Sequence, residues 1–94
     1  MTIDTRTVTF KITGKVQGVW FRAYSRDSAL SLNIDGWVKI DPDGSVFGEA
    51  VGSEKNMEKF INVLRKGSPN SRVEDVFVEE SPETGNYSGF EIRF

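Results

Sequence analysis

The chain contains no cysteine and no histidine. Without cysteine it can form no disulfide framework and offers no thiolate as a nucleophile or metal ligand. Without histidine it lacks the commonest zinc ligand and the usual general base of enzymes. Any chemistry must therefore come from other side chains or from the backbone, and we expect neither a metal nor an organic cofactor.

The chain also has no excess of positive charge, because 12 lysines and arginines stand against 14 aspartates and glutamates, for a net charge of −2. A nucleic-acid binder normally presents a basic face, so we expect no nucleic-acid partner. The first ten residues are largely polar, and we expect no membrane span, no secretory segment and a cytoplasmic protein. With 94 residues, of which 37% are hydrophobic, the chain predicts one small domain over residues 1–94. We also expect a monomer.

Apolar periodicity divides the chain into strands and helices. The expected strands span residues 5–14, 34–40, 45–51 and 72–80, with a short strand at the end of the chain, and the expected helices span residues 21–32 and the stretch between Ser53 and Gly67. Residues 41–44 predict a tight turn with Gly44 in the left-handed conformation. This order favours an α+β fold, a ferredoxin-like βαββαβ sandwich with two helices on one face of a mixed antiparallel sheet.

The most informative segment is Gly14-Lys15-Val16-Gln17-Gly18-Val19-Trp20-Phe21-Arg22. A strand that enters a glycine-bearing turn and then a helix directs backbone N–H groups and the positive helix end at one point, which suits an anion. Arg22 adds a planar fork of donors that matches a phosphate or a carboxylate. A cation near a helix start is otherwise unfavourable, so its position indicates a functional role.

This segment resembles the first signature of the acylphosphatases, a run of the form Gly-x-Val-x-Gly-Val-x-Phe-Arg. The similarity covers nearly the whole chain, through Gly36-Trp37-Val38-Lys39, Asp43-Gly44-Ser45-Val46, Gly67-Ser68-Pro69 and Tyr87-Ser88-Gly89-Phe90-Glu91-Ile92. It implies the same ferredoxin-like architecture and a hydrolase that cleaves small acyl phosphates to carboxylate and phosphate by direct attack of water. The resemblance further implies a phosphate site built from Gln17, Gly18, Val19, Trp20, Phe21 and Arg22.

One position departs from that pattern. The second acylphosphatase signature reads Gly-Trp-Val-x-Asn, and its asparagine orients the attacking water, whereas this chain has Ile40 there. An aliphatic side chain neither donates nor accepts a hydrogen bond. Asp41 follows, but adjacent strand residues point to opposite faces. We therefore expect Ile40 not to function as the asparagine does, and turnover to be weak or absent.

Two interpretations remain open from the sequence. The first is an acylphosphatase with weakened activity, and the second is a binding module that holds phosphate or carboxylate groups on the same fold without turnover. The partner in either case is a small acyl phosphate or inorganic phosphate. An RNA-recognition domain has the same element order, but the expected third strand, Ser45-Val46-Phe47-Gly48-Glu49-Ala50-Val51, has one aromatic residue and an acidic one where such a domain has a basic-aromatic run.

Overall fold

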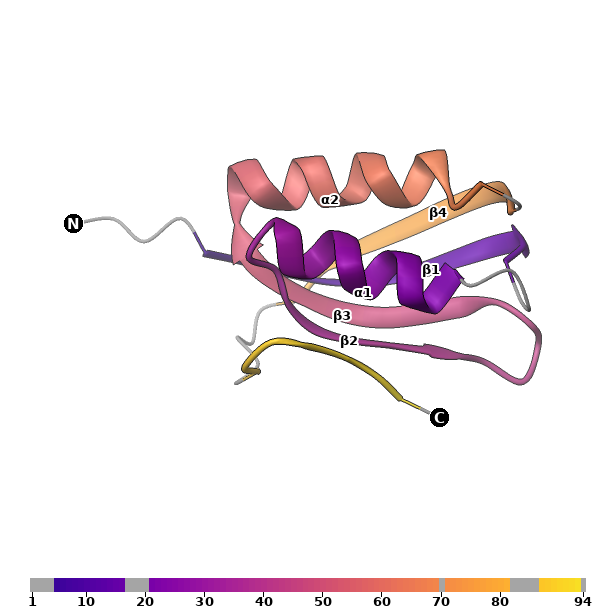
Figure 1. The fold of residues 1–94 in the computed structure, drawn as a ribbon, viewed down its shortest axis with the longest axis horizontal. Helices are drawn as coiled ribbons and strands as arrows, with labels where there is room; N and C mark the ends of the chain where they lie inside the picture. The colour runs from indigo at the N-terminus through magenta and orange to yellow at the C-terminus, as the bar shows by residue number, and fades with distance from the viewer. Residues whose placement is uncertain (1–4, 17–20, 70, 82–86, 94) are drawn as a thin grey trace.

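The computed structural model describes residues 5–16, 21–69, 71–81 and 87–93. Its elements follow the predicted order: β1 (Thr5–Lys15), α1 (Phe21–Ser31), β2 (Asp35–Ile40), β3 (Val46–Ser53), α2 (Glu54–Lys66), β4 (Arg72–Glu80) and β5 (Phe90–Ile92). Both helices lie on one face of the sheet, as Figure 1 shows. The ferredoxin-like α+β fold predicted from the sequence is confirmed. Neither helix in the described part of the chain is long and apolar enough to cross a membrane.

The sheet has five strands in the order β4-β1-β3-β2-β5. β1 pairs antiparallel with both β3 and β4, β2 pairs antiparallel with β3, and β5 runs parallel to β2. β1 therefore lies between β4 and β3, and it is followed in the chain by α1. The first strand is slightly longer than predicted, since Lys15 still pairs with Arg72.

The core lies between the sheet and the two helices. Val8, Phe10 and Ile12 of β1 are buried, whereas Thr9 and Lys11 between them are not, which is the period-two pattern of a strand with one covered face. Phe60 of α2 packs its ring edge-to-face against Phe10 at 5.9 Å. Burial of these apolar side chains between the two layers stabilises the packing of the helices on this face.

Each helix buries one face, with buried residues three and four positions apart. Phe21, Ser25 and Ala29 of α1 are buried, and Leu32 just beyond the helix packs against the core. In α2 the buried residues are Met57, Phe60 and Leu64, with Ile61 partly buried. Ser53 caps α2, as its Oγ accepts a hydrogen bond from the Asn56 N–H at 3.2 Å. Gly67 ends the helix with φ 79°, and its N–H donates to the Val63 carbonyl.

Gly36 is a glycine because the neighbouring strand leaves no room for a side chain. Its φ is 144°, and a Cβ there would lie 1.9 Å from the carbonyl oxygen of Glu49. Gly14 is in the same situation at φ 121°, where a Cβ would lie 2.1 Å from the Arg72 carbonyl oxygen. Strand packing therefore accounts for these two motif glycines without reference to a ligand.

We expect Gly36→Ala to lower the free energy of unfolding by about 3 kcal/mol or more, because the methyl group collides with backbone that cannot move away. Urea denaturation measures the change. Gly89→Ala is the matched control: φ is 81° there, but a Cβ meets nothing within 4 Å. It adds only the left-handed backbone cost of about 1 kcal/mol. Equal losses at the two positions would show that the close contact at Gly36 is not decisive.

Candidate active site

Three segments meet at one end of the molecule. Figure 1 shows that β1 ends, α1 begins and the β2–β3 turn lies at the same end of the sheet. Val16, after β1, and Phe21, at the start of α1, are both buried. The structure thus fixes both flanks of the predicted anion-binding turn. Gln17, Gly18, Val19 and Trp20, which the sequence assigns to that turn, lie outside the described residues.

The first turn of α1 is anchored to its surroundings. Phe21 is 1% exposed, and a Cβ on Gly67 would lie 3.8 Å from its ring, so the segment that ends α2 passes beside it. Ser25, one turn later, is fully buried and donates from its Oγ to the Phe21 carbonyl at 2.8 Å. This hydrogen bond engages the Ser25 hydroxyl within the helix, which agrees with a small residue at a helix–sheet contact.

Arg22 lies in the first turn of α1 and is half-buried. The first turn of this helix contains no acidic residue. A guanidinium at this position adds to the positive potential of the helix N-terminus, so an anion there interacts favourably with both. Arg22 is therefore placed where a positive charge would stabilise a bound oxyanion.

Ile40 ends β2 on the side of the sheet that the helices cover. It lies in register with Val46, and it alternates with Val38 and Gly36, which are both buried. The Ile40 side chain is partly buried and packs against the hydrophobic core. It therefore contributes apolar packing at the same end of the molecule as Arg22, and it offers no polar group to a water molecule.

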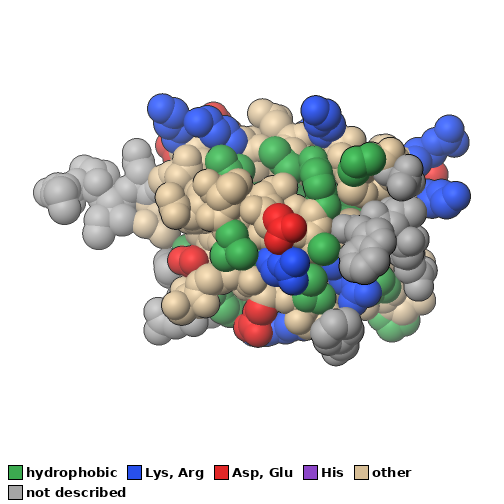
Figure 2. Space-filling view, viewed as in Figure 1, with side chains coloured by type: hydrophobic (Ala, Val, Ile, Leu, Met, Phe, Trp, Pro, Cys, Tyr) green, Lys and Arg blue, Asp and Glu red, His purple; other side chains and the backbone are tan. Residues whose placement is uncertain are grey.

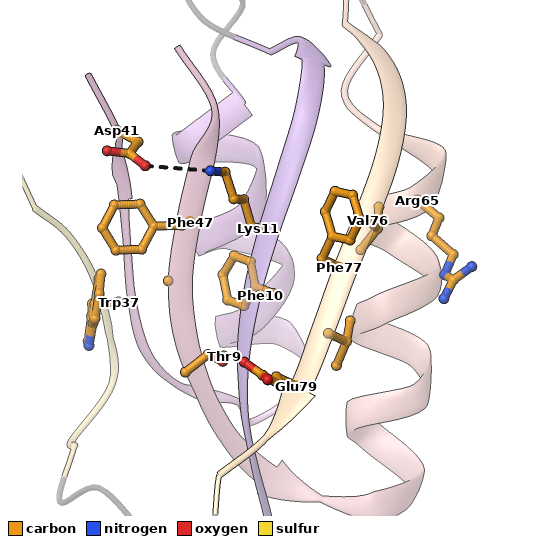
Figure 3. Close-up of a pocket in the computed structure, with 12 residues that line it drawn as sticks. Thr9, Phe10, Lys11, Trp37, Asp41, Phe47, Arg65, Val76, Phe77 and Glu79 are labelled. Atoms are coloured by element: carbon orange, nitrogen blue, oxygen red, sulfur yellow. Dashed lines mark ion pairs between the residues drawn. The ribbon is translucent and has the colours of Figure 1, made fainter. Parts of the chain in front are cut away.

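Asp41 does not substitute for the missing amide. Its Oδ2 lies 3.8 Å from the Nζ of Lys11, as the dashed line in Figure 3 shows. Lys11 alternates with the buried Phe10 and Ile12, so it belongs to the face of the sheet opposite the helices. The Asp41 carboxylate is thus directed to the face opposite Ile40, as strand alternation predicts.

The β2–β3 turn is held by a dense set of hydrogen bonds. The backbone carbonyl of Asp41 accepts a hydrogen bond from the Gly44 N–H at 2.9 Å, and Gly44 has φ 90°. Both features confirm the predicted turn. Asp43 Oδ1 accepts from the backbone N–H of Ser45 at 2.9 Å and from its hydroxyl at 2.5 Å. Lys11 donates from its Nζ to Asp43 Oδ2 at 3.0 Å.

These bonds stabilise the ionised carboxylate. The Ser45 hydroxyl contributes most, followed by the Ser45 backbone N–H and Lys11, and together they lower the pKa of Asp43 from 3.8 to about 2. The hydrogen bond to Asp43 in turn raises the pKa of Lys11. Because the folded-state pKa of Asp43 is depressed, its contribution to stability is complete above its ordinary pKa and is lost as the pH falls through about 2.

We expect Ser45→Ala to raise the pKa of Asp43 toward 3.8, and to raise it more than Lys11→Met does. Both variants remove one side-chain hydrogen bond from the carboxylate, but the shorter bond comes from Ser45. A ¹³C NMR titration of the Asp43 carboxyl group between pH 1 and pH 6 measures both values. A larger shift in Lys11→Met would mean that charge, and not the hydroxyl, dominates.

Two hollows lie near these residues, on different parts of the molecule. The smaller, of about 410 Å³, is lined by the end of β1 and the β2–β3 turn, at Thr13, Gly14, Lys15, Asp43, Gly44 and Ser45. The larger, of about 930 Å³, lies over the uncovered face of the sheet between Phe77 and Phe47. We place the candidate site at the start of α1 and not in the larger hollow. The lining of the larger hollow is mostly apolar, and its two cations, Lys11 and Arg65, are matched by two carboxylates, Asp41 and Glu79, so it has no excess of positive charge for a phosphate.

Comparison with known proteins agrees with the fold. A family model described as Acylphosphatase matches residues 8–92. An acylphosphatase of Pelotomaculum thermopropionicum is 42% identical over 83 residues, covering 88% of this chain and 90% of the relative. One of Syntrophobacter fumaroxidans is 41% identical over 92 residues, covering 98% and 95%. The solved structure of an acylphosphatase from Coxiella burnetii matches with a TM-score of 0.91 at 33% identity, covering 96% of this chain and 94% of that one.

Proposed function

This chain belongs to the acylphosphatase family, and we propose that it hydrolyses small acyl phosphates to a carboxylate and phosphate at a rate limited by Ile40. Family membership and fold support acyl phosphate hydrolase activity. The single observation that carries the proposal is Arg22 in the first turn of α1, directly after the glycine-bearing segment of the motif.

The proposed chemistry needs few side chains. In an acyl phosphate the leaving group is a carboxylate, whose conjugate acid has a pKa of about 4, as in a glutamic acid side chain. It leaves without being protonated, so the site does not have to supply a general acid. The transition state spreads negative charge over the phosphoryl oxygens, and positioned donors stabilise it. We assign this role to the amides of Gln17 to Phe21 and to the guanidinium of Arg22.

A water molecule must attack phosphorus on the side opposite the leaving oxygen. Ile40 occupies the position where the family signature has an asparagine, and its side chain packs against the core. Loss of a group that aligns or activates the nucleophile lowers a rate by about 10²- to 10⁴-fold. The groups that we propose to bind phosphate, the backbone amides and Arg22, do not include residue 40. We therefore propose that phosphate binding is retained while turnover is slow.

The packing of Ile40 also supports the second candidate, a module on the same fold that binds phosphate or carboxylate groups without hydrolysis. The two functions are separated by incubating the protein with benzoyl phosphate and measuring the release of benzoate above the spontaneous rate. Release that is proportional to protein concentration supports the hydrolase. No release, together with saturable binding of orthophosphate, supports the binding module.

A further inference from the structure

β4 forms one edge of the sheet, and in the described sheet it pairs only with β1. The N–H and C=O groups on the outer side of an edge strand are free to pair with another chain. Phe77, in the middle of β4, is 56% exposed, a large exposed fraction for a phenyl ring. An exposed aromatic ring on an open strand edge is a feature of binding surfaces.

Two carboxylates flank this ring on the same face of the sheet. Asp75, Phe77 and Glu79 lie in register with Thr13, Lys11 and Thr9 of β1, so all three belong to the face that the helices leave open. Residues two apart on one face of a strand are separated by about 7 Å. Within the described part of the chain, neither Asp75 nor Glu79 forms an ion pair.

On the same face of the sheet, an arginine of this chain stacks on an aromatic ring beside a carboxylate. The guanidinium of Arg93 lies 4.8 Å from the centre of the Trp37 ring. Its Nη2 is 3.4 Å from the carboxylate of Glu91, which is directly opposite Trp37 in the sheet. The combination of an aromatic face with an adjacent carboxylate is a favourable environment for arginine. Phe77 lies between two carboxylates in the same way. Lys11 is opposite Phe77 in register, but its Nζ is directed to Asp41 and Asp43, and no cation of the described residues lies over the Phe77 ring.

The net negative charge of β4 indicates which kind of partner could bind its outer edge. The strand contains Glu74, Asp75, Glu79 and Glu80 against one arginine, Arg72. A second copy that paired through β4 would place these carboxylates against one another. Like charges on paired strands repel, so this pairing is unfavourable. The same carboxylates attract a basic strand and repel a nucleic acid.

We propose that the outer edge of β4 binds an extended, arginine-bearing segment of another protein. The segment adds a strand to the sheet, and one of its guanidinium groups stacks on Phe77 between Asp75 and Glu79. Backbone hydrogen bonds supply affinity that does not depend on sequence, and the ring with its two carboxylates selects arginine. This interaction does not rest on hydrolysis, because β4 and the start of α1 are separate parts of the molecule.

The test uses a short peptide that alternates threonine with arginine, and a matched peptide with glutamate in place of arginine. Titration of the arginine peptide is expected to shift the backbone NMR signals of Val76 and Val78 saturably and to slow hydrogen exchange along β4. Phe77→Ala is expected to weaken binding by about fivefold, the effect of losing one cation–π contact. Leu30→Ala, which removes a similarly exposed apolar side chain from α1, is expected to leave binding unchanged.

The proposal is overturned by no saturable shift in β4, by equal binding of the arginine and glutamate peptides, or by equal affinity of Phe77→Ala and the parent chain for the arginine peptide. A concentration-dependent dimer whose β4 signals are already protected would likewise assign the edge to a second copy. Glu79→Gln tests the carboxylate separately and keeps the side-chain volume, so its expected weakening of arginine binding does not depend on the Phe77 variant.

Discussion

Replacing Ile40 with asparagine is expected to raise kcat for benzoyl phosphate by about 10²- to 10⁴-fold, the usual effect of restoring a group that aligns or activates a nucleophile. The expected change is mostly in kcat, because the groups proposed to bind phosphate, Arg22 among them, are the same in both proteins. Steady-state kinetics on the parent chain and the variant give kcat and KM separately. The corresponding barrier change is about 3 to 5 kcal/mol.

Two control measurements test whether the change in kcat is due to the asparagine side chain. Ile40→Leu keeps an aliphatic side chain at the end of β2 and is expected to leave kcat within about twofold of the parent chain, since a volume-conserving swap perturbs packing little. Ile40→Asn loses apolar packing, so we expect its free energy of unfolding to be lower by about 1 to 3 kcal/mol. The assay is therefore carried out well below the melting temperature of this variant. Equal kcat in the parent chain and the folded Ile40→Asn variant would show that Ile40 does not limit turnover.

Removing Arg22 is expected to have an effect of similar size in the opposite direction. In the Ile40→Asn background, which provides a measurable rate, Arg22→Ala is expected to lower kcat/KM by about 10³-fold or more and to abolish phosphate binding at millimolar concentration. An arginine that stabilises a transferring phosphoryl group contributes about 10³- to 10⁵-fold. Arg22→Lys is expected to restore only part of the loss, because a lysine cannot hold two oxygens with one planar group.

Arg26 provides the matched control on the same helix. It lies one turn after Arg22, and its Nε is 3.1 Å from the Asp27 carboxylate. Arg26→Ala removes the same charge from α1, and we expect kcat/KM to change by less than about twofold, since an exposed ion pair contributes little. Comparable losses in Arg22→Ala and Arg26→Ala would attribute the effect to the overall charge of the helix and not to contact with the phosphoryl group.

Local patterns in the sequence were sufficient to predict most of the fold. The stripe of Met57, Phe60 and Leu64 gave the buried face of α2, because side chains three and four apart lie on one side of a helix. Ser53 indicated where α2 begins, because a hydroxyl just before the first turn accepts a hydrogen bond from a free backbone N–H. β1 extends one residue beyond its predicted end because Lys15 gains a partner in Arg72, which no local pattern contains.

In the candidate site, only the positions of residues within a single sequence motif could be predicted. The motif placed Arg22 at the helix start and Ile40 at the end of a strand, and both are found there. Contacts between distant segments could not be foreseen, because they depend on the register of the strands. Tyr87, for example, accepts the Trp37 Nε1–H at 3.2 Å and donates to Glu49 at 3.0 Å. The exposed ring of Phe77 was also missed, since a phenylalanine within a strand pattern predicts burial.

Orthophosphate titration followed by backbone NMR tests the central claim most directly, because it needs no turnover. The account predicts that the Gly18 and Arg22 amide signals move saturably at millimolar phosphate, and that the Gly18 signal no longer moves in Arg22→Ala. Sulfate, which is also tetrahedral, is expected to compete for the same signals. Amide signals of Gly18 and Arg22 that stay in place while phosphate rises through the millimolar range would contradict it.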